Sequence, residues 1–247
     1  MYNDFAEVYD KLQDADYGKF VDFYEAIFER LGLKPELVLD LACGTGNITL
    51  PMAERGYDMI GLDMSVEMLN IARDKACESG KDILFLCQDM CEMELFGTVD
   101  AVVCALDGVN YITDYEDLKQ LFRLMANYLN PGGVFIFDIN SVHKLRNILG
   151  NNTFVNDEQG IFYVWQSEFS EETQICDFGL TFFEEQEDGS FERFDEFQQE
   201  RAYTIAEISE AAELAGLQVT GVYKPFEFAT ADDNDERIFF AVSKKMG

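Results

Sequence analysis

Two glycines and an aspartate near residue 44 have the spacing of a ligand-binding turn. The apolar stretch VLDL contains Asp40 and runs into ACGTG, where Gly44 and Gly46 let the backbone bend and approach a ligand. A helix that begins behind such a turn offers free N–H groups to a carboxylate, and Asp40 can accept from an ammonium group. The turn therefore favours a ligand with an amino-acid end. A pyrophosphate would prefer a third glycine, where this chain has Thr49.

Acidic and apolar residues also follow the next three apolar stretches. Asp63 follows the second, where its carboxylate can accept both ribose hydroxyls of an adenosine. Asp89 follows the third and can accept from the adenine amino group, with Met64 and Met90 on either face of the purine. Leu106 follows the fourth and is expected to line the pocket near a sulfonium. These positions predict one extended binding site.

The elements that must position these residues alternate between strand and helix from about residue 20 to residue 140. The predicted strands are 37–41, 58–62, 83–87, 99–105 and 134–138, and the predicted helices are 20–31, 46–55, 65–79 and 114–129. This alternation is typical of an α/β fold with a doubly wound parallel sheet. Ligands of such sheets bind beyond the carboxyl ends of the strands.

The pattern changes after residue 150. Segments 160–169, 174–184 and 191–203 are rich in aromatic residues and predict a small antiparallel β insertion over 150–203, with a hairpin turn at 187–190. A capping box of Thr204 and Glu207 predicts a helix over 204–215. Segments 217–228 and 236–244 are expected to return as an antiparallel edge pair. Because no flexible linker interrupts the chain, residues 1–247 are expected to form a single domain.

Residues from about 36 to 140 resemble the core of the class I S-adenosylmethionine-dependent methyltransferases. DLACGTGNIT is similar to the first motif of that family, GLDMSVEMLNIAR to the second and FLCQDM to the third. The resemblance implies a Rossmann-like, mostly parallel sheet of seven strands, S-adenosyl-L-methionine as cofactor, and an insertion that caps the substrate. The cofactor contacts that it implies are Gly44, Gly46, Asp63, Met64, Asp89, Met90 and Leu106.

In related enzymes the N-terminal segment folds over the cofactor as a lid. Residues 1–20 of this chain are the corresponding segment, and Tyr9 and Tyr17 are the tyrosines expected to reach the cofactor. The alternative is that this segment is simply a docked amphipathic helix.

Candidate substrate-binding residues lie at strand ends and in the insertion, namely Asn110, Tyr111, Asn140, Trp165 and Arg201. The same side chains would also serve to hold the insertion together. No catalytic residue is predicted, because methyl transfer from a sulfonium is an in-line displacement in which the protein mainly positions and desolvates the acceptor. The acceptor is expected to be a small molecule of unidentified structure.

Charge and composition limit the partners. Asp and Glu number 48 against 18 Lys and Arg, a net charge of −30 without a basic cluster, which disfavours nucleic acid and anionic membranes. No apolar run reaches the ~18–20 residues that span a bilayer, and the first residues do not resemble a secretory signal, so a cytoplasmic location is expected. The six cysteines lack the spacing of a zinc site, and no metal is expected.

Three other interpretations of the function stay open at this point. An NAD(P)-dependent oxidoreductase would share the fold, although the missing third glycine and Asp89 count against it. A non-catalytic S-adenosylmethionine-binding module would share the motifs, although a cap and a lid favour an enclosed substrate. An RNA methyltransferase would keep the same cofactor, but the net charge disfavours it.

Overall fold

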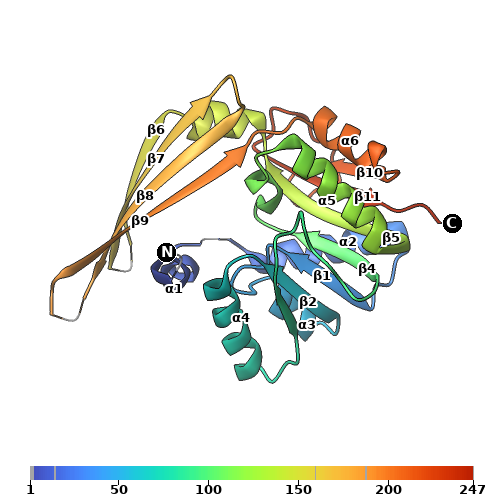
Figure 1. Cartoon of the computed structure of the whole chain (residues 1–247), viewed down its shortest axis with the longest axis horizontal. Coiled ribbons are helices and arrows are strands. Elements are labelled where there is room, and N and C mark those ends of the chain that lie inside the picture. Colours follow the sequence, from blue (N-terminus) through green and yellow to red (C-terminus); the bar gives the residue numbers. More distant parts are fainter. Residues whose placement is uncertain (1–2, 14, 159, 187, 247) are drawn as a thin grey trace.

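The computed structural model describes residues 3–13, 15–158, 160–186 and 188–246. A seven-stranded sheet flanked by helices forms the main body, and a four-stranded antiparallel sheet projects from one side of it (Figure 1). None of the described helices is both long enough and apolar enough to span a membrane.

The seven-stranded sheet has the order β10-β11-β5-β4-β1-β2-β3. Its strands are β1 (Leu37–Leu41), β2 (Asp58–Asp63), β3 (Leu84–Cys87), β4 (Val99–Cys104), β5 (Leu129–Asn140), β10 (Gln218–Tyr223) and β11 (Arg237–Ser243). Strands β1 to β5 pair in parallel, and β11 runs antiparallel to both β5 and β10. The predicted mostly parallel sheet is confirmed. Because β1 to β5 are parallel, their carboxyl ends meet at one edge.

Helices cover both faces of this sheet. They are α2 (Tyr17–Leu31), α3 (Thr49–Glu54), α4 (Val66–Glu78), α5 (Tyr115–Tyr128) and α6 (Ile205–Leu214). Successive residues of β1 point to opposite faces, as strand geometry requires. Val38 packs in the cluster that contains Tyr24 of α2, whereas Leu39 packs in the cluster of Leu121 and Ile208 from α5 and α6.

The helix starts follow local capping chemistry. Ser65 accepts from the Met68 N–H at the start of α4, and Thr204 and Glu207 form the predicted capping box of α6. Gly32 ends α2 in the left-handed conformation, with φ of 67°.

The cap is the antiparallel sheet of β6 (Asn152–Glu158), β7 (Ile161–Ser170), β8 (Ile175–Glu185) and β9 (Phe191–Arg201), in that order. Beneath it lies the helix α1 (Asn3–Leu12), next to α4 (Figure 1). Short helical turns η1 (Gly108–Tyr111) and η2 (Lys144–Leu149) follow β4 and β5. The cap is therefore inserted between β5 and α6.

Three local predictions differ from the structure. Helix α3 begins at Thr49 rather than at residue 46, because the glycine turn continues through residue 48. Strand β5 already begins at Leu129 rather than at residue 134, and inside it the Gly132 N–H donates to the Lys244 carbonyl at 2.9 Å. Strand β6 was not predicted, because NTFVNDE is mostly polar and becomes a strand by pairing with β7 at the sheet edge.

Candidate active site

A cavity of about 650 Å³ lies at the carboxyl ends of the parallel strands, and α1 and the cap also contribute to its wall. This volume lies within the range of about 300–1,000 Å³ that is common for small-molecule sites. A second, larger hollow of about 850 Å³ lies on the cap, where polar side chains such as Asn152, Gln166 and Ser167 line it. None of the predicted cofactor residues lines this second hollow, so the cavity of about 650 Å³ is the candidate site.

The two glycines of the turn have different roles. Gly44 lines the cavity with φ of +54°, and a Cβ there would meet nothing within 4 Å, so space is left open for a ligand. Gly46 has φ of +81° and does not line the cavity. A Cβ at Gly46 would lie 2.7 Å from Leu50 Cδ1 and 3.2 Å from Ala72 Cβ, so this glycine allows α3 and α4 to pack closely.

Asp63 is fixed at the cavity wall by two backbone donors. Its carboxylate accepts from the Gly44 N–H and the Ser65 N–H, both at 2.9 Å. Burial raises the pKa of Asp63 above its ordinary value. Each carboxylate oxygen has a second lone pair. The side chain can therefore order the glycine turn and the start of α4 while still accepting from a ligand hydroxyl.

Asp40 lies deeper in the wall and is almost completely buried. The Thr49 hydroxyl donates to its Oδ2 at 2.6 Å, which ties β1 to the start of α3. Burial raises the pKa of Asp40 to about 7. A carboxyl group in this environment is well suited to accept from a cationic ligand group, since such a group would offset the loss of hydration.

The predicted adenine-binding residues also reach the cavity. Met64, Asp89 and Met90 all line it, and the Met64 side chain is 68% exposed. Asp89 Oδ1 accepts from the Cys91 N–H at 2.7 Å, so the loop after β3 is ordered locally. The structure brings these side chains to the same cavity as Asp63.

The turn after β4 has an unusual backbone. Leu106 and Asp107 both have positive φ, 54° and 56°, a conformation that costs an L-residue roughly 1–2 kcal/mol. Asp138 of β5 accepts from both backbone N–H groups, at 2.9 and 3.1 Å. Arg237 of β11 pairs with Asp138 and, at 2.7 Å, with Asp107. The two strands thus hold the turn in place.

Asp138 and Arg237 were missed in the sequence analysis. Asp138 is completely buried inside the apolar strand VFIFDIN, and an acid in such a strand is a signal of a specific partner. Burial raises the pKa of Asp138 even though Arg237 opposes the shift. The partner itself lies 99 residues away in the chain and carries no local signal.

Helix α1 is docked onto the glycine turn by one acidic side chain. Asp10 Oδ1 accepts from the Thr45 hydroxyl at 2.7 Å and from Asn47 Nδ2 at 2.8 Å, and Oδ2 pairs with Lys75 Nζ at 2.5 Å. Although burial raises the pKa of Asp10, the hydrogen bonds from Lys75 and its neighbours outweigh it and lower the pKa. The apolar face of α1 is buried as well, with Val8 at 0% exposure.

Both predicted lid tyrosines line the cavity. Tyr9 lies on α1, and burial raises its pKa. Tyr17 begins α2 rather than the lid itself, and Asn47 Nδ2 lies 2.9 Å from its hydroxyl. The segment therefore has the features of both alternatives: it is a docked amphipathic helix, and it contributes to the wall over the glycine turn.

Of the predicted acceptor-binding residues, Tyr111, Asn140 and Trp165 line the cavity. The Tyr111 hydroxyl donates to Gln198 Oε1 of the cap at 3.0 Å. Asn140 Nδ2 donates to Glu200 Oε2 at 2.8 Å, so the end of β5 also contacts the cap. Polar groups of the main sheet and of the cap therefore meet at one end of the cavity.

Asn110 does not line the cavity. It is completely buried, and its Nδ2 donates to the backbone carbonyls of Asn140 and Arg201 at 3.0 and 2.9 Å. Its Oδ1 accepts from the Asn140 N–H at 2.9 Å. All of these partners are backbone groups, so Asn110 joins η1 to β5 and β9 within the fold.

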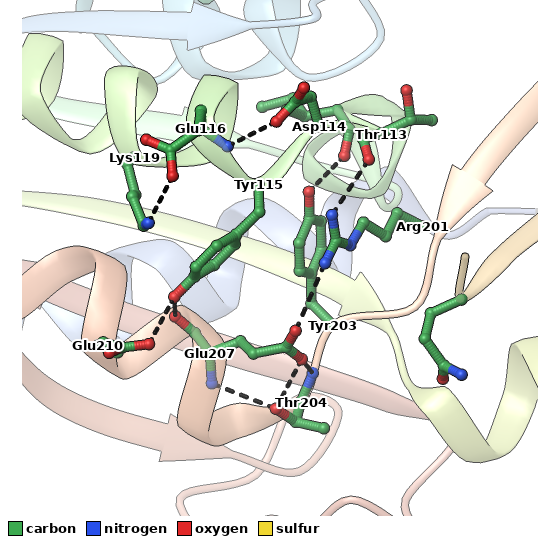
Figure 2. A network of polar contacts seen from close by, with 12 residues as sticks. Thr113, Asp114, Tyr115, Glu116, Lys119, Arg201, Tyr203, Thr204, Glu207 and Glu210 are labelled. Carbon is green, nitrogen blue, oxygen red and sulfur yellow. Dashed lines mark hydrogen bonds and ion pairs between the residues drawn. The ribbon is translucent and has the colours of Figure 1, made fainter. Parts of the chain in front are cut away.

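Arg201 also lies outside the cavity lining and belongs instead to a polar network with Thr113 and Glu207 (Figure 2). Its guanidinium donates to the Thr113 carbonyl at 3.3 Å, pairs with Glu207 at 3.6 Å and lies 5.1 Å from the ring centre of Tyr203. The Tyr115 hydroxyl, close by, donates to Glu210 at 2.8 Å. This network fastens the end of the cap to α5 and α6.

Comparisons with known proteins agree with this geometry. Residues 38–133 match the family described as methyltransferase domain. The chain is 34% identical over 246 residues to YqeM of Bacillus subtilis, a protein named as a methyltransferase, with 99% of this chain and 97% of that protein covered. It resembles the crystal structure of an S-adenosylmethionine-dependent methyltransferase from Clostridium acetobutylicum, with 36% identity, a TM-score of 0.91 and 99% of each chain covered.

A more distant structure shares the fold with the cofactor in place. The amino pentose methyltransferase CalS10 from Micromonospora echinaspora, solved with S-adenosylmethionine bound, has a TM-score of 0.76 at 20% identity, with 99% of this chain and 98% of that chain covered. The chain belongs to the class I S-adenosylmethionine-dependent methyltransferases. S-adenosyl-L-methionine is its cofactor, and the chain is an enzyme of methyl transfer.

Proposed function

We propose that this enzyme methylates a small molecule enclosed between the sheet edge and the cap. The observation that supports this most directly is a cavity lined both by residues of the cofactor motifs and by aromatic and polar side chains of the cap. A shared cavity allows donor and acceptor to meet without crossing solvent.

The cofactor would lie along the carboxyl ends of the parallel strands. We assign the ribose hydroxyls to Asp63, the adenine to the loop of Asp89 and Met90, and the amino-acid end to the turn at Gly44, above Asp40. The methyl group would then face the turn at Leu106. Open space at Gly44 and acidic groups at successive strand ends fit the shape and charge of this cofactor.

The cofactor, when bound, supplies an electrophilic methyl group. The chain's own contribution is to hold the acceptor in line and to exclude water. Tyr111, Asn140 and Trp165 present polar and aromatic groups towards the acceptor end, and α1 and the cap cover the site. Such positioning provides most of the rate enhancement that a displacement needs.

The net charge of −30 supports a small acceptor over a nucleic acid, since a phosphate backbone would meet repulsion at most of the surface. A cytoplasmic location stays a prediction.

The test replaces Asp63 at one end of β2 and uses Asp58, exposed at the other end of the same strand, as a matched control. Loss of paired hydrogen bonds to a charged group costs ~1.5–3 kcal/mol, so Asp63→Ala should weaken S-adenosylhomocysteine binding roughly 10- to 150-fold. Asp58→Ala should leave the affinity unchanged. Calorimetric titration of folded variants measures both, and equal affinity in the two variants would remove Asp63 from the site.

A further inference from the structure

Glu200 is a buried acid that faces the candidate active site. It lies on β9, is 5% exposed and lines the cavity. Its Oε2 accepts from Asn140 Nδ2 at 2.8 Å, an uncharged donor. The neighbouring Arg201 points the other way, into the network that fastens the cap, because successive residues of a strand face opposite sides. Glu200 is thus held by a firmly anchored strand.

Two cations lie near Glu200, but each is engaged by other groups. Lys144 of η2 donates to Asn140 Oδ1 at 2.8 Å. Arg237 pairs with Asp107 and Asp138. The Asn140 amide therefore lies between Glu200 and Lys144: it donates to the Glu200 carboxylate and accepts from the Lys144 ammonium. No ion pair to Glu200 is present among the described residues.

Burial raises the pKa of Glu200 to about 8, and the negative charge of Asp107 acts in the same direction. Lys144 and Arg237 oppose the shift. The register partner of Glu200 on β8 is Cys176, and burial raises the pKa of its thiol to about 12, so the thiol stays neutral. A carboxyl group in this setting gains most from a positively charged partner that enters through the cavity.

The charge of the whole lining agrees with a cationic ligand. Two lining residues are basic, Lys144 and Arg237. The acidic lining residues are Asp40, Asp63, Asp89, Asp107, Asp117 and Glu200. Such an excess of carboxyl groups in an enclosed site attracts cations and repels anions.

Glu200 is also close to the turn where methyl transfer is expected. Arg237 Nη2 lies 2.7 Å from Asp107 Oδ1 and 3.4 Å from Asn140 Oδ1, and the same Asn140 contacts Glu200. A short chain of direct contacts therefore joins the turn after β4 to the carboxyl group of the cap.

We propose that Glu200 binds the ammonium group of an amine acceptor and takes the proton that this nitrogen must lose before methylation. This inference rests on the proposed function and names its substrate class. One N–H bond of the ammonium breaks, and its proton moves to a Glu200 oxygen. The nitrogen lone pair then forms the new N–C bond, while the C–S bond breaks and its electron pair stays on sulfur. The product leaves as a methylated ammonium, and Glu200 later releases its proton to solvent.

The test compares Glu200→Gln with Glu192→Gln, which makes the same substitution at an exposed position of the same strand. S-adenosylhomocysteine is first titrated into each folded protein. S-adenosylhomocysteine formation is then followed with three matched pairs of probes: glucosamine and glucose, ethanolamine and ethylene glycol, glycine and glycolate. Wild type and Glu192→Gln should methylate at least one amine and prefer it to its matched alcohol.

Glu200→Gln should bind S-adenosylhomocysteine normally but lose about 10²- to 10⁴-fold in kcat/KM for that amine. The loss should shrink as the pH rises and solvent removes the amine proton, a dependence that a merely structural role would not produce. Failure of every amine, preference for the alcohols, or a wild-type pH profile in Glu200→Gln would each overturn the inference. Absence of S-adenosylhomocysteine binding in wild type would instead overturn the proposed function.

Discussion

Replacing Asp138 by asparagine tests how the turn after β4 is held. Three donors converge on this carboxylate: the N–H groups of Leu106 and Asp107, and the guanidinium of Arg237. An asparagine of the same shape keeps one acceptor oxygen and presents an NH₂ group in place of the other. The Asp107 N–H and Arg237 both donate to Oδ2, and an amide oxygen at that position still accepts from both. The NH₂ group then faces the Leu106 N–H, which loses its acceptor at Oδ1, so the left-handed turn loses part of its support.

The magnitude follows from burial. Asp138 has 0% side-chain exposure, and Arg237 has 19%. An unsatisfied buried donor costs about 1–3 kcal/mol. Since the Leu106 N–H is the donor left without an acceptor and Arg237 keeps Asp107 as a partner, we expect Asp138→Asn to lower the free energy of unfolding by about 2 kcal/mol.

Asp22→Asn is the matched control. Arg55 also pairs with two acids, Asp22 and Glu25, but Asp22 is 68% exposed. Loss of an exposed pair should cost no more than about 1 kcal/mol. Urea unfolding at neutral pH, followed by circular dichroism, compares both variants with wild type.

An Asp138→Asn protein that is as stable as Asp22→Asn, or more stable than wild type, would refute this role of Asp138. Burial raises the pKa of Asp138, so keeping this group charged has its own cost. A neutral or stabilising result would mean that this cost exceeds the value of the hydrogen bonds to the turn.

Two further predictions concern buried polar groups. The pKa of Asp40 is about 7 in the fold against 3.8 ordinarily, so the folded state binds the proton more tightly, and the stabilisation present below pH 4 is lost as the pH rises through 7. The unfolding free energy of wild type relative to Asp40→Asn should therefore fall by up to about 4 kcal/mol between pH 4 and 8 in urea titrations, and a constant difference would contradict the assignment. Asn110→Ala should destabilise the fold by about 3 kcal/mol while changing S-adenosylhomocysteine affinity less than about 3-fold, because the amide bonds only backbone groups. An Asn110→Ala protein of normal stability but altered acceptor KM would restore the acceptor-binding role predicted from the sequence.

The elements that depend on local chemistry were predictable from the sequence. Ser65 and Thr204 cap helices through contacts with residues only three positions further along the chain. Strands β1 and β4 are short, mainly apolar runs. Strand β6 was not, because its residues have no strong strand preference and acquire strand structure from β7.

The acceptor end of the site was only partly predictable, for a related reason. Glu200 and Arg201 are adjacent, and the choice of which one faces the cavity depends on the register of β9 with β8. Arg201 was predicted from the sequence to bind the acceptor, whereas Glu200 is the residue in the cavity lining. Asn110 was likewise predicted to bind the acceptor, but its side chain hydrogen-bonds the backbone of β5 and β9 instead.

The position of Arg237 near the end of the chain affects when the enzyme can bind its cofactor during synthesis. All the cofactor motifs precede residue 110, yet the guanidinium that pairs with Asp107 follows it by 130 residues. Chains emerge from the ribosome N-terminus first. The nascent protein therefore carries every motif well before β11 exists to secure the turn at Leu106. We expect a nascent chain that lacks β11 to bind S-adenosylmethionine poorly. The cofactor should then bind well only after β11 has joined the sheet.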